Sequence, residues 1–235
     1  MMPPLATSQK PLANTVIAVT SAGRGFGHSI AKALSQAGAT VICIDANPEA
    51  ASLTAAELER GGAESIPIKG DCSVQLEVAN TFHKMLEIYG SINGLVHIAD
   101  EASSTPFKKL LEGEFSEMLE TTARSSYLML QMLLKRCPNA WATLILPPQA
   151  NNEPQTRALR SYLSGLVGGL SETGMRVNAL VPSRAAGGLE FDARLGESAV
   201  SLALTASRGI TGQTIGVTLS PIKDVRSNIP REFLV

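Results

Sequence analysis

The stretch from Thr20 to Gly27 combines residue types that can hold a phosphate-bearing ligand. Three glycines, at positions 23, 25 and 27, follow a β-branched apolar run and precede an amphipathic segment. Glycines let the backbone turn tightly and approach a pyrophosphate, which binds N–H groups at the positive start of a helix. This strand–turn–helix context predicts a dinucleotide site or the remnant of one. The alternative is a tight turn without a ligand.

Strands and helices alternate along the chain, which would place this turn at the edge of a sheet. The near-continuous apolar run that ends at Asp45 predicts a strand covered on both faces. The alternation indicates parallel βαβ units and an α/β, doubly wound, Rossmann-type sheet. We predict strands at 16–19, 38–45, 65–69, 94–100, 141–146, 175–181 and 214–219, helices after Gly27 and at 48–60, 74–89, 115–137, 155–171 and 199–207, and a loop at 182–196.

The composition fits a single domain. A net charge of -1, from 20 basic and 21 acidic residues, argues against nucleic-acid or membrane-surface binding. No window approaches the roughly 18 apolar residues of a membrane span, and the first ten residues lack the apolar core of a signal peptide. The three cysteines lack metal-ligand or disulfide spacing. We expect no metal site and a cytoplasmic protein, with the domain at 14–220 between tails at 1–13 and 221–235.

Four segments of the chain resemble one family, the short-chain dehydrogenases/reductases (SDRs). They are the glycine turn, LVHIA at 95–99, RVNALVP at 176–182 and ITGQTI at 210–215, in the family's order. The resemblance covers nearly the whole chain. It implies a sheet of about seven parallel strands with helices on both faces, and NAD or NADP at the carboxyl ends of the strands.

The resemblance places the cofactor contacts after several of the predicted strands. They are Thr20, Arg24, Gly25, Phe26, Gly27, Asp45, Asp71, Cys72, Ala99 and Pro182. Asp45 would bind the adenosine ribose and repel a 2′-phosphate, which favours NAD, although Arg24 is typical of NADP users. Asp45 and Asp71 also have simpler interpretations, as a solvated acid at a strand end and as a helix cap. Ser21 replaces the family's first glycine and Asp100 the glycine of its Asn-Asn-Ala-Gly turn, and both changes weaken the predicted site.

The proton chemistry that the resemblance implies is missing. The family uses a tyrosine as general acid/base, a lysine four residues later that lowers the tyrosine pKa, a serine and an asparagine. The three tyrosines of the chain, Tyr89, Tyr127 and Tyr162, are followed four residues later by Asn93, Gln131 and Leu166. No tyrosine therefore has its lysine.

Counting back from the RVN segment shows what replaces the four residues. The tyrosine position falls on Asn152, the lysine on Thr156, the serine near Pro148 and the helix asparagine near Thr122. None of these side chains exchanges a proton near neutral pH. We therefore predict no catalytic residue at these positions.

A retained fold without its proton donors favours a catalytically silent SDR-fold subunit. The family's two long helices pack across a two-fold axis, so we expect a homodimer, a homotetramer or a complex with an active SDR paralogue. Met129, Leu133 and Leu163 would serve either that surface or the core. One alternative is an active NAD(H)-dependent oxidoreductase for an alcohol or ketone, with His97 handling the proton; otherwise His97 fills the pocket. Another is an NAD(H)-binding sensor without chemistry.

Overall fold

The computed structural model describes residues 10–100, 102–204 and 207–219. Its centre is a seven-stranded sheet in the order β3-β2-β1-β4-β5-β6-β7, with every neighbouring pair parallel. The strands are β1 (Val16–Val19), β2 (Thr40–Asp45), β3 (Ser65–Lys69), β4 (Gly94–Ile98), β5 (Trp141–Ile145), β6 (Val177–Pro182) and β7 (Thr214–Val217). The predicted doubly wound α/β class is confirmed.

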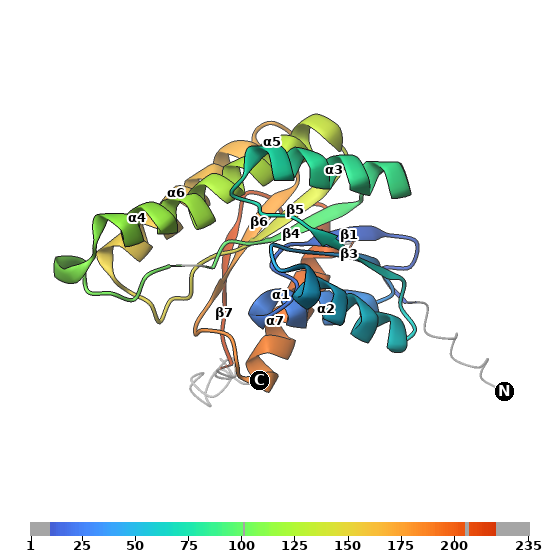
Figure 1. Ribbon diagram of the computed structural model, residues 1–235, viewed down its shortest axis with the longest axis horizontal. Coiled ribbons are helices and arrows are strands. Elements are labelled where there is room, and N and C mark those ends of the chain that lie inside the picture. Colours follow the sequence, from blue (N-terminus) through green and yellow to red (C-terminus); the bar gives the residue numbers. More distant parts are fainter. Residues whose placement is uncertain (1–9, 101, 205–206, 220–235) are drawn as a thin grey trace, which may run out of the picture.

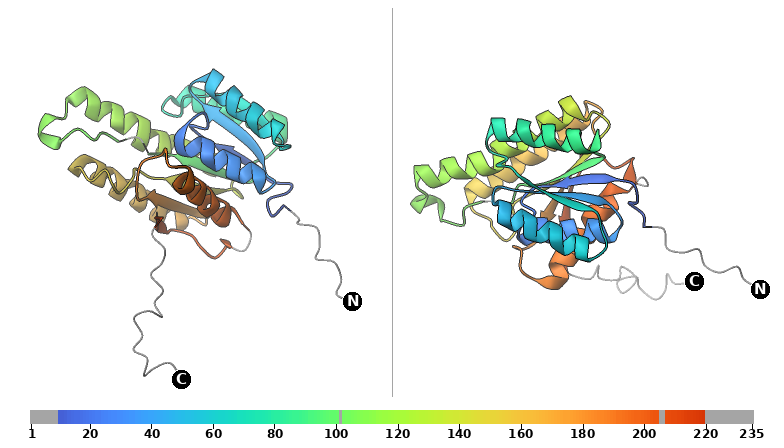
Figure 2. Two further views of the ribbon diagram at one scale, coloured as in Figure 1. Left: turned by 90° about the horizontal axis from the view of Figure 1, so that it is seen from below. Right: turned by 45° about the vertical axis from the view of Figure 1, so that its right-hand side comes forward.

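Helices cover both faces of the sheet (Figure 1). On one side lie α3 (Gln75–Tyr89), α4 (Glu112–Met118), α5 (Ser125–Arg136) and α6 (Pro154–Ser171), and on the other α1 (Gly25–Gln36), α2 (Pro48–Arg60) and α7 (Leu189–Ala203). A short 3-10 helix (Phe107–Lys109) precedes α4. Helices α1 and α7 lie side by side in the left view of Figure 2.

The two helical layers explain why the strand sequences are continuous apolar runs. Successive residues of β1 enter opposite cores: Ala18 packs under the α3–α5–α6 layer, and Ile17 and Val19 pack under α1 and α7. Every residue of β4 and β5 is buried. A strand covered on both faces needs apolar side chains at every position rather than at every second one.

The predicted loop at 182–196 is wrong over its second half, because α7 already begins at Leu189. Phe191, Leu195, Ala199 and Leu202 recur at helical spacing and are buried against α1 and the sheet. The acidic Glu190 and Asp192 in the first turn suit the positive end of the helix dipole. Glycines and small residues just before Leu189 obscure this start in the sequence.

The long helix predicted at 115–137 begins at Glu112 and contains an irregular segment. A π-helical stretch, Leu119–Arg124, joins α4 to α5 without a break in helical backbone. Met129 and Leu133 are fully buried in the core beside Leu163 of α6. The sequence left open whether these three residues form an assembly surface or the core, and the structure assigns them to the core.

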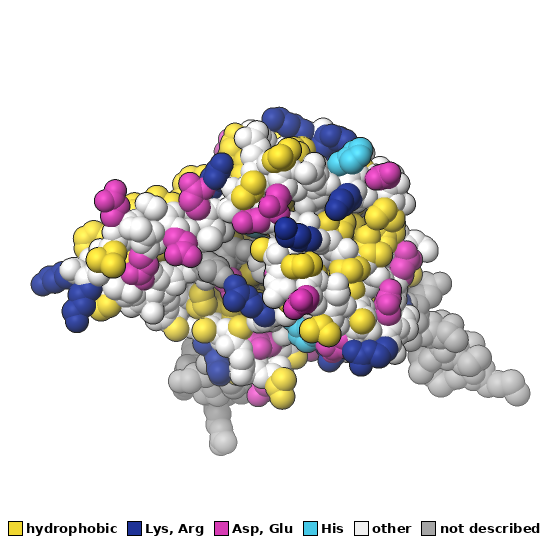
Figure 3. All heavy atoms as spheres, viewed as in Figure 1, with side chains coloured by type: hydrophobic (Ala, Val, Ile, Leu, Met, Phe, Trp, Pro, Cys, Tyr) yellow, Lys and Arg dark blue, Asp and Glu magenta, His cyan; other side chains and the backbone are white. Residues whose placement is uncertain are grey.

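The surface and the chain ends add little to the predicted organisation. On the face in Figure 3, basic and acidic side chains are interspersed. None of the helices in the described part is both long and apolar enough for a membrane span.

The end of the first predicted tail is part of the fold. Leu12, which the sequence assigned to that tail, is buried, and its N–H donates to Ala37 O at 2.9 Å. The rest of that tail up to residue 9, and the whole tail at 221–235, lie outside the described residues.

Candidate cofactor site and its surroundings

The glycine turn follows β1 and leads directly into α1. A Cβ at Gly27 would lie 2.1 Å from Ser21 O, so only glycine fits there. Gly25, the first residue of α1, has φ +53°, a backbone conformation that glycine adopts without strain. The turn is therefore a cradle of backbone N–H groups at a helix start, which is the geometry that a pyrophosphate requires.

Ser21 has a backbone conformation that favours glycine. Its φ is +48°, in the left-handed region that costs a residue with a Cβ about 1–2 kcal/mol. A serine at this position therefore strains the turn.

Asp45, at the end of β2, ties the glycine turn to the start of α2. Its Oδ2 accepts from Gly23 N at 2.9 Å and its Oδ1 from Asn47 N at 2.9 Å. Asn47 in turn caps α2. A carboxylate has about four lone-pair sites, so Asp45 still has acceptor capacity for ribose hydroxyls. Its structural role is larger than that of a solvated acid at a strand end.

Asp71 and Cys72 follow β3 and line a pocket of about 300 Å³ together with Asp45 and Arg24. Asp71 Oδ1 accepts from Ser73 N at 2.8 Å and from Ser73 Oγ at 2.7 Å, which forms a side-chain turn two residues long. The interpretation of Asp71 as a helix cap is wrong, because the N-cap of α3 is Val74 and no described side chain caps that helix. Burial, and then the neighbouring Asp71, raise the pKa of the Cys72 thiol to about 12. Cys72 is therefore a neutral, unreactive part of the wall.

A second pocket, of about 360 Å³, opens on the other side of the turn and is bordered by Gly25, Phe26 and Asp100. Ser21, Arg24 and Ile98 line both pockets, so the two adjoin. They lie at the carboxyl ends of β1, β2 and β4, the edge at which open α/β sheets bind dinucleotides. The cradle, the adjoining pockets and the Asp45 carboxylate together fit such a ligand.

Four predicted contacts line neither pocket. Gly27 lies beneath the turn, and Thr20 is buried and bonds to His97. Ala99 donates its N–H to Ile145 O at 2.8 Å, and Pro182 O accepts from Gln149 N at 2.7 Å. Residues that sequence reasoning missed do line the first pocket: Ser73, Glu117, Thr121 and Ser125. No local motif marks them, since three come from a distant helical segment.

His97 is held in one neutral form. Its Nδ1 lies 3.0 Å from Thr20 Oγ1 and its Nε2 lies 3.2 Å from Ser125 Oγ. Thr20 Oγ1 already accepts from Ile98 N, and Ser125 Oγ donates to Thr121 O, so Thr20 donates to Nδ1 and Nε2–H donates to Ser125. Burial lowers the pKa of His97 to about 4. With both nitrogens engaged, His97 has the geometry of a structural residue rather than a proton donor.

Of the four positions predicted to replace the catalytic residues, Thr156 belongs to a set of contacts that holds residues 102–105, together with its unpredicted neighbours Asn151 and Gln155. Thr156 is fully buried, and its Oγ1 donates to Ser103 O at 3.2 Å. Asn151 Nδ2 donates to the same carbonyl at 3.1 Å, and Gln155 Nε2 donates to Thr105 O at 2.8 Å. We call this set of contacts with residues 102–105 the clamp.

The clamp also has a second side. Glu114 of α4 accepts hydrogen bonds from the Ser103 and Thr105 hydroxyls through its Oε1. These bonds, Ser103 first, lower the pKa of Glu114. The segment is therefore fixed from α4 and from the start of α6.

Two of the three other positions that the sequence predicted to replace catalytic residues are buried. Pro148 is buried, and Arg160 of α6 bonds to its carbonyl at 2.8 Å and to Asn151 O at 2.7 Å. Thr122 is fully buried within the π-helical segment. Asn152 is exposed. Within the described residues no cluster of three or more histidine, cysteine or acidic side chains suits a metal ion.

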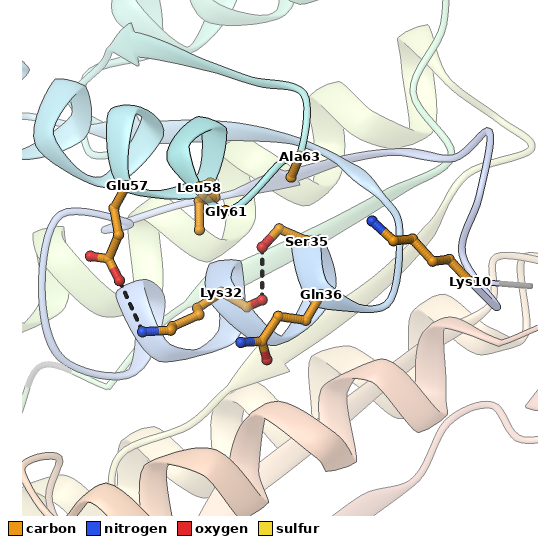
Figure 4. Close-up of a pocket in the computed structure, with 8 residues that line it drawn as sticks. All are labelled: Lys10, Lys32, Ser35, Gln36, Glu57, Leu58, Gly61 and Ala63. Carbon is orange, nitrogen blue, oxygen red and sulfur yellow. Dashed lines mark hydrogen bonds and ion pairs between the residues drawn. The ribbon is translucent and has the colours of Figure 1, made fainter. Parts of the chain in front are cut away.

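A further pocket, of about 320 Å³, lies between α1 and α2 (Figure 4). Glu57 pairs with Lys32 at 2.9 Å and with His28 at 2.9 Å. Hydrogen bonds from His28 and then Lys32 lower the pKa of Glu57 to about 2. These charges already compensate one another, which favours a solvated surface cluster.

Comparison with known proteins agrees with the fold and with the first half of the site. A tetrahydroxynaphthalene reductase from Pestalotiopsis fici is 31% identical over 141 residues, covering 57% of this chain and 49% of the reductase. An uncharacterized oxidoreductase from Bacillus subtilis is 27% identical over 116 residues, covering 49% and 45% of the two chains. The chain thus matches about half the length of these curated relatives.

Solved structures match over almost the whole fold. A hydroxysteroid dehydrogenase from Escherichia coli has a TM-score of 0.80 at 21% identity, covering 90% of this chain and 98% of its own. A 3-ketoacyl-(acyl-carrier-protein) reductase from Brucella melitensis, complexed with NADH, has a TM-score of 0.77 at 19% identity, covering 88% and 97%. Residues 15–145, more than half of the chain, match the short chain dehydrogenase family. The chain therefore belongs to the short-chain dehydrogenase family.

Proposed function

We propose that this protein is an NAD(H)-binding, redox-silent member of its family that serves as a non-catalytic subunit. The observation that carries the proposal is the clamp. Asn151 and Gln155 donate through their amide nitrogens, and Thr156 through its hydroxyl, to backbone carbonyls of residues 102–105. None of the three side chains titrates near neutral pH. A scaffold that keeps its nucleotide cradle and fills its reaction site suits a binding role.

The glycine turn would hold the pyrophosphate, and Asp45 would accept the ribose hydroxyls. NAD(H) bound there would bring a hydride-transferring ring, but the chain's own residues provide no proton at the reacting oxygen. His97, close to the pocket, is neutral and engaged at both nitrogens. The named relatives are reductases or oxidoreductases, yet the family match ends at residue 145, before the clamp residues of the loop and α6.

Two measurements on the purified protein test this proposal. NADH should raise the melting temperature, because it binds the folded state alone, and no nicotinamide oxidation or reduction should occur across panels of alcohols and ketones. Robust turnover would overturn the silent assignment. An unchanged melting temperature at millimolar cofactor would overturn the binding role.

The preference for NAD has its own test in Asp45. Asp45→Asn removes the charge that repels a 2′-phosphate, so the ratio of NADP to NAD affinity should rise about tenfold. Glu49→Gln, which removes an exposed charge from the first turn of α2, is the matched control and should leave the ratio unchanged. An equal ratio in the wild type and Asp45→Asn would remove Asp45 from cofactor selection.

The assembly surface is proposed on the outer side of α5 and α6. Tyr127 is 46% exposed and Tyr162 is 47% exposed, and Leu119 of the adjoining π segment is 38% exposed. A second copy of this chain would cover these apolar side chains. Light scattering should report a dimer, and Tyr162→Glu should shift it toward monomer, whereas Tyr89→Glu on α3 should not. A monomeric wild type would contradict the homodimer and leave an SDR paralogue as the partner to be sought by co-expression.

A further inference from the structure

A separate pocket lies at the opposite edge of the sheet from the cofactor cleft. It has a volume of about 480 Å³, larger than either cleft pocket, and its lining includes Thr15, Asn93, Trp141 and Arg176. Each of these residues stands at or just before the first residue of a parallel strand, β1, β4, β5 and β6 respectively. The pocket therefore lies at the amino ends of the strands, where the family chemistry has no part.

Two arginines line this pocket, Arg176 half-buried and Arg208 exposed. None of the described lining residues is acidic. No ion pair includes either arginine among the described residues. Burial, and then the charge of Arg208, lower the pKa of Arg176. The partial burial of Arg176 and the nearby like charge of Arg208 cost free energy, which a bound anion would offset.

Asn93 adds a further donor to the pocket. Asn93 Oδ1 accepts from Val16 N at 2.7 Å, which fixes the amide and leaves its NH₂ group as the remaining polar group. Arg176 lies over the Trp141 ring, 5.4 Å from its centroid, and donates to Leu202 O at the end of α7. Through that last contact, one N–H of Arg176 satisfies a backbone carbonyl in the last turn of α7. It does not account for Arg208, which has no such bond in the described residues.

We propose that this pocket binds a phosphate group carried by a small molecule. Two guanidinium groups match the two negative charges and the fork geometry of a phosphate monoester. The volume is in the range that small-molecule ligands occupy and exceeds the needs of a bare ion. The site is independent of the cofactor cleft and of the function proposed for it.

Trp141 makes the proposal directly measurable, because it is the only tryptophan of the chain. Inorganic phosphate and glycerol 3-phosphate are titrated separately at constant ionic strength while tryptophan emission is recorded. Movement of Arg176 above the indole on binding should give a saturable change, with the phosphate ester binding more tightly than inorganic phosphate. Sodium chloride at the same ionic strength should give none.

Variants decide whether the arginine pair is responsible. Arg208→Gln should weaken binding about tenfold or more, because a charge-assisted bond is lost. Arg194→Gln, at an exposed position on α7 outside the pocket, is the matched control and should bind like the wild type. The proposal is overturned if emission does not saturate with either phosphate compound, or if Arg208→Gln and Arg194→Gln bind equally well.

Discussion

The nucleotide end and the reaction end of the cleft differ in what constrains their residues. At the nucleotide end the constraint is backbone space: Gly27 has no room for a Cβ, and Asp45 ties the turn to α2 through two backbone N–H groups. At the reaction end the constraint is hydrogen bonding, since Thr156 and its neighbours hold residues 102–105. A steric constraint on the backbone allows only glycine, whereas a position held by hydrogen bonds accepts any side chain that makes the same bonds.

The largest expected effect breaks the nucleotide end. Gly27→Ala places a Cβ 2.1 Å from Ser21 O, so the turn must move, and we expect a loss of about 3 kcal/mol in the free energy of unfolding. Urea denaturation measures it. Gly165→Ala, in α6 with nothing within 4 Å, is the control and should stabilise by about 0.5–1 kcal/mol. Equal stabilities for the two variants would contradict the steric constraint.

A pH series probes His97, which lies between the two ends. Its pKa falls from 6.5 to about 4 on folding, so the unfolded chain takes up a proton in this interval that the folded chain refuses. The free energy of unfolding is therefore unaffected by His97 above pH 6.5 and decreases as the pH falls from 6.5 toward 4, by about 3 kcal/mol in total.

A variant separates the effect of His97 protonation on stability from that of the carboxylates, which also titrate at low pH. Urea denaturation between pH 7 and 4.5 should show a shallower loss of stability in His97→Asn than in the wild type. His83→Asn, at an exposed position on α3, should keep the wild-type slope. An unchanged slope in His97→Asn would mean that His97 is solvated rather than locked.

The clamp predicts a smaller effect at the reaction end. Thr156→Val keeps the shape of the side chain but removes one of the two donors to Ser103 O, the other being Asn151, so we expect a loss of about 1 kcal/mol by urea denaturation. Thr173→Val removes an exposed bond to Leu170 O and should change stability by less than about 0.5 kcal/mol. If both variants behave alike, the clamp has no special role.

The smallest expected change in stability concerns Ser21 in the glycine turn. Ser21→Gly relieves a left-handed backbone at φ +48° and should raise the free energy of unfolding by about 1 kcal/mol. Ser91→Gly, at an exposed position with no such conformation, should not stabilise. Thermal denaturation compares them, and a destabilised Ser21→Gly would show that the serine hydroxyl matters more than the strain.

Local patterns predicted most of the fold because each strand and helix is encoded within a short window. The two-sided apolar run that ends at Asp45 and the glycine turn after β1 are examples. The start of α7 was missed because the small residues before Leu189 resemble a loop, and the four buried apolar residues that define the helix lie beyond them. The pocket residues Thr121 and Ser125 were missed because their role depends on the packing of α5 over the sheet.

The sequence alone determined the α/β class, the glycine cradle and the absence of any tyrosine with a lysine four residues later, because these depend on neighbours along the chain. Only the tertiary structure decided how the replaced residues are used. Thr20 meets His97 across 77 positions, and Thr156 meets Ser103 across 53. Hydrogen bonds depend on distance in space, and a parallel sheet brings such residues together only after its crossovers have formed.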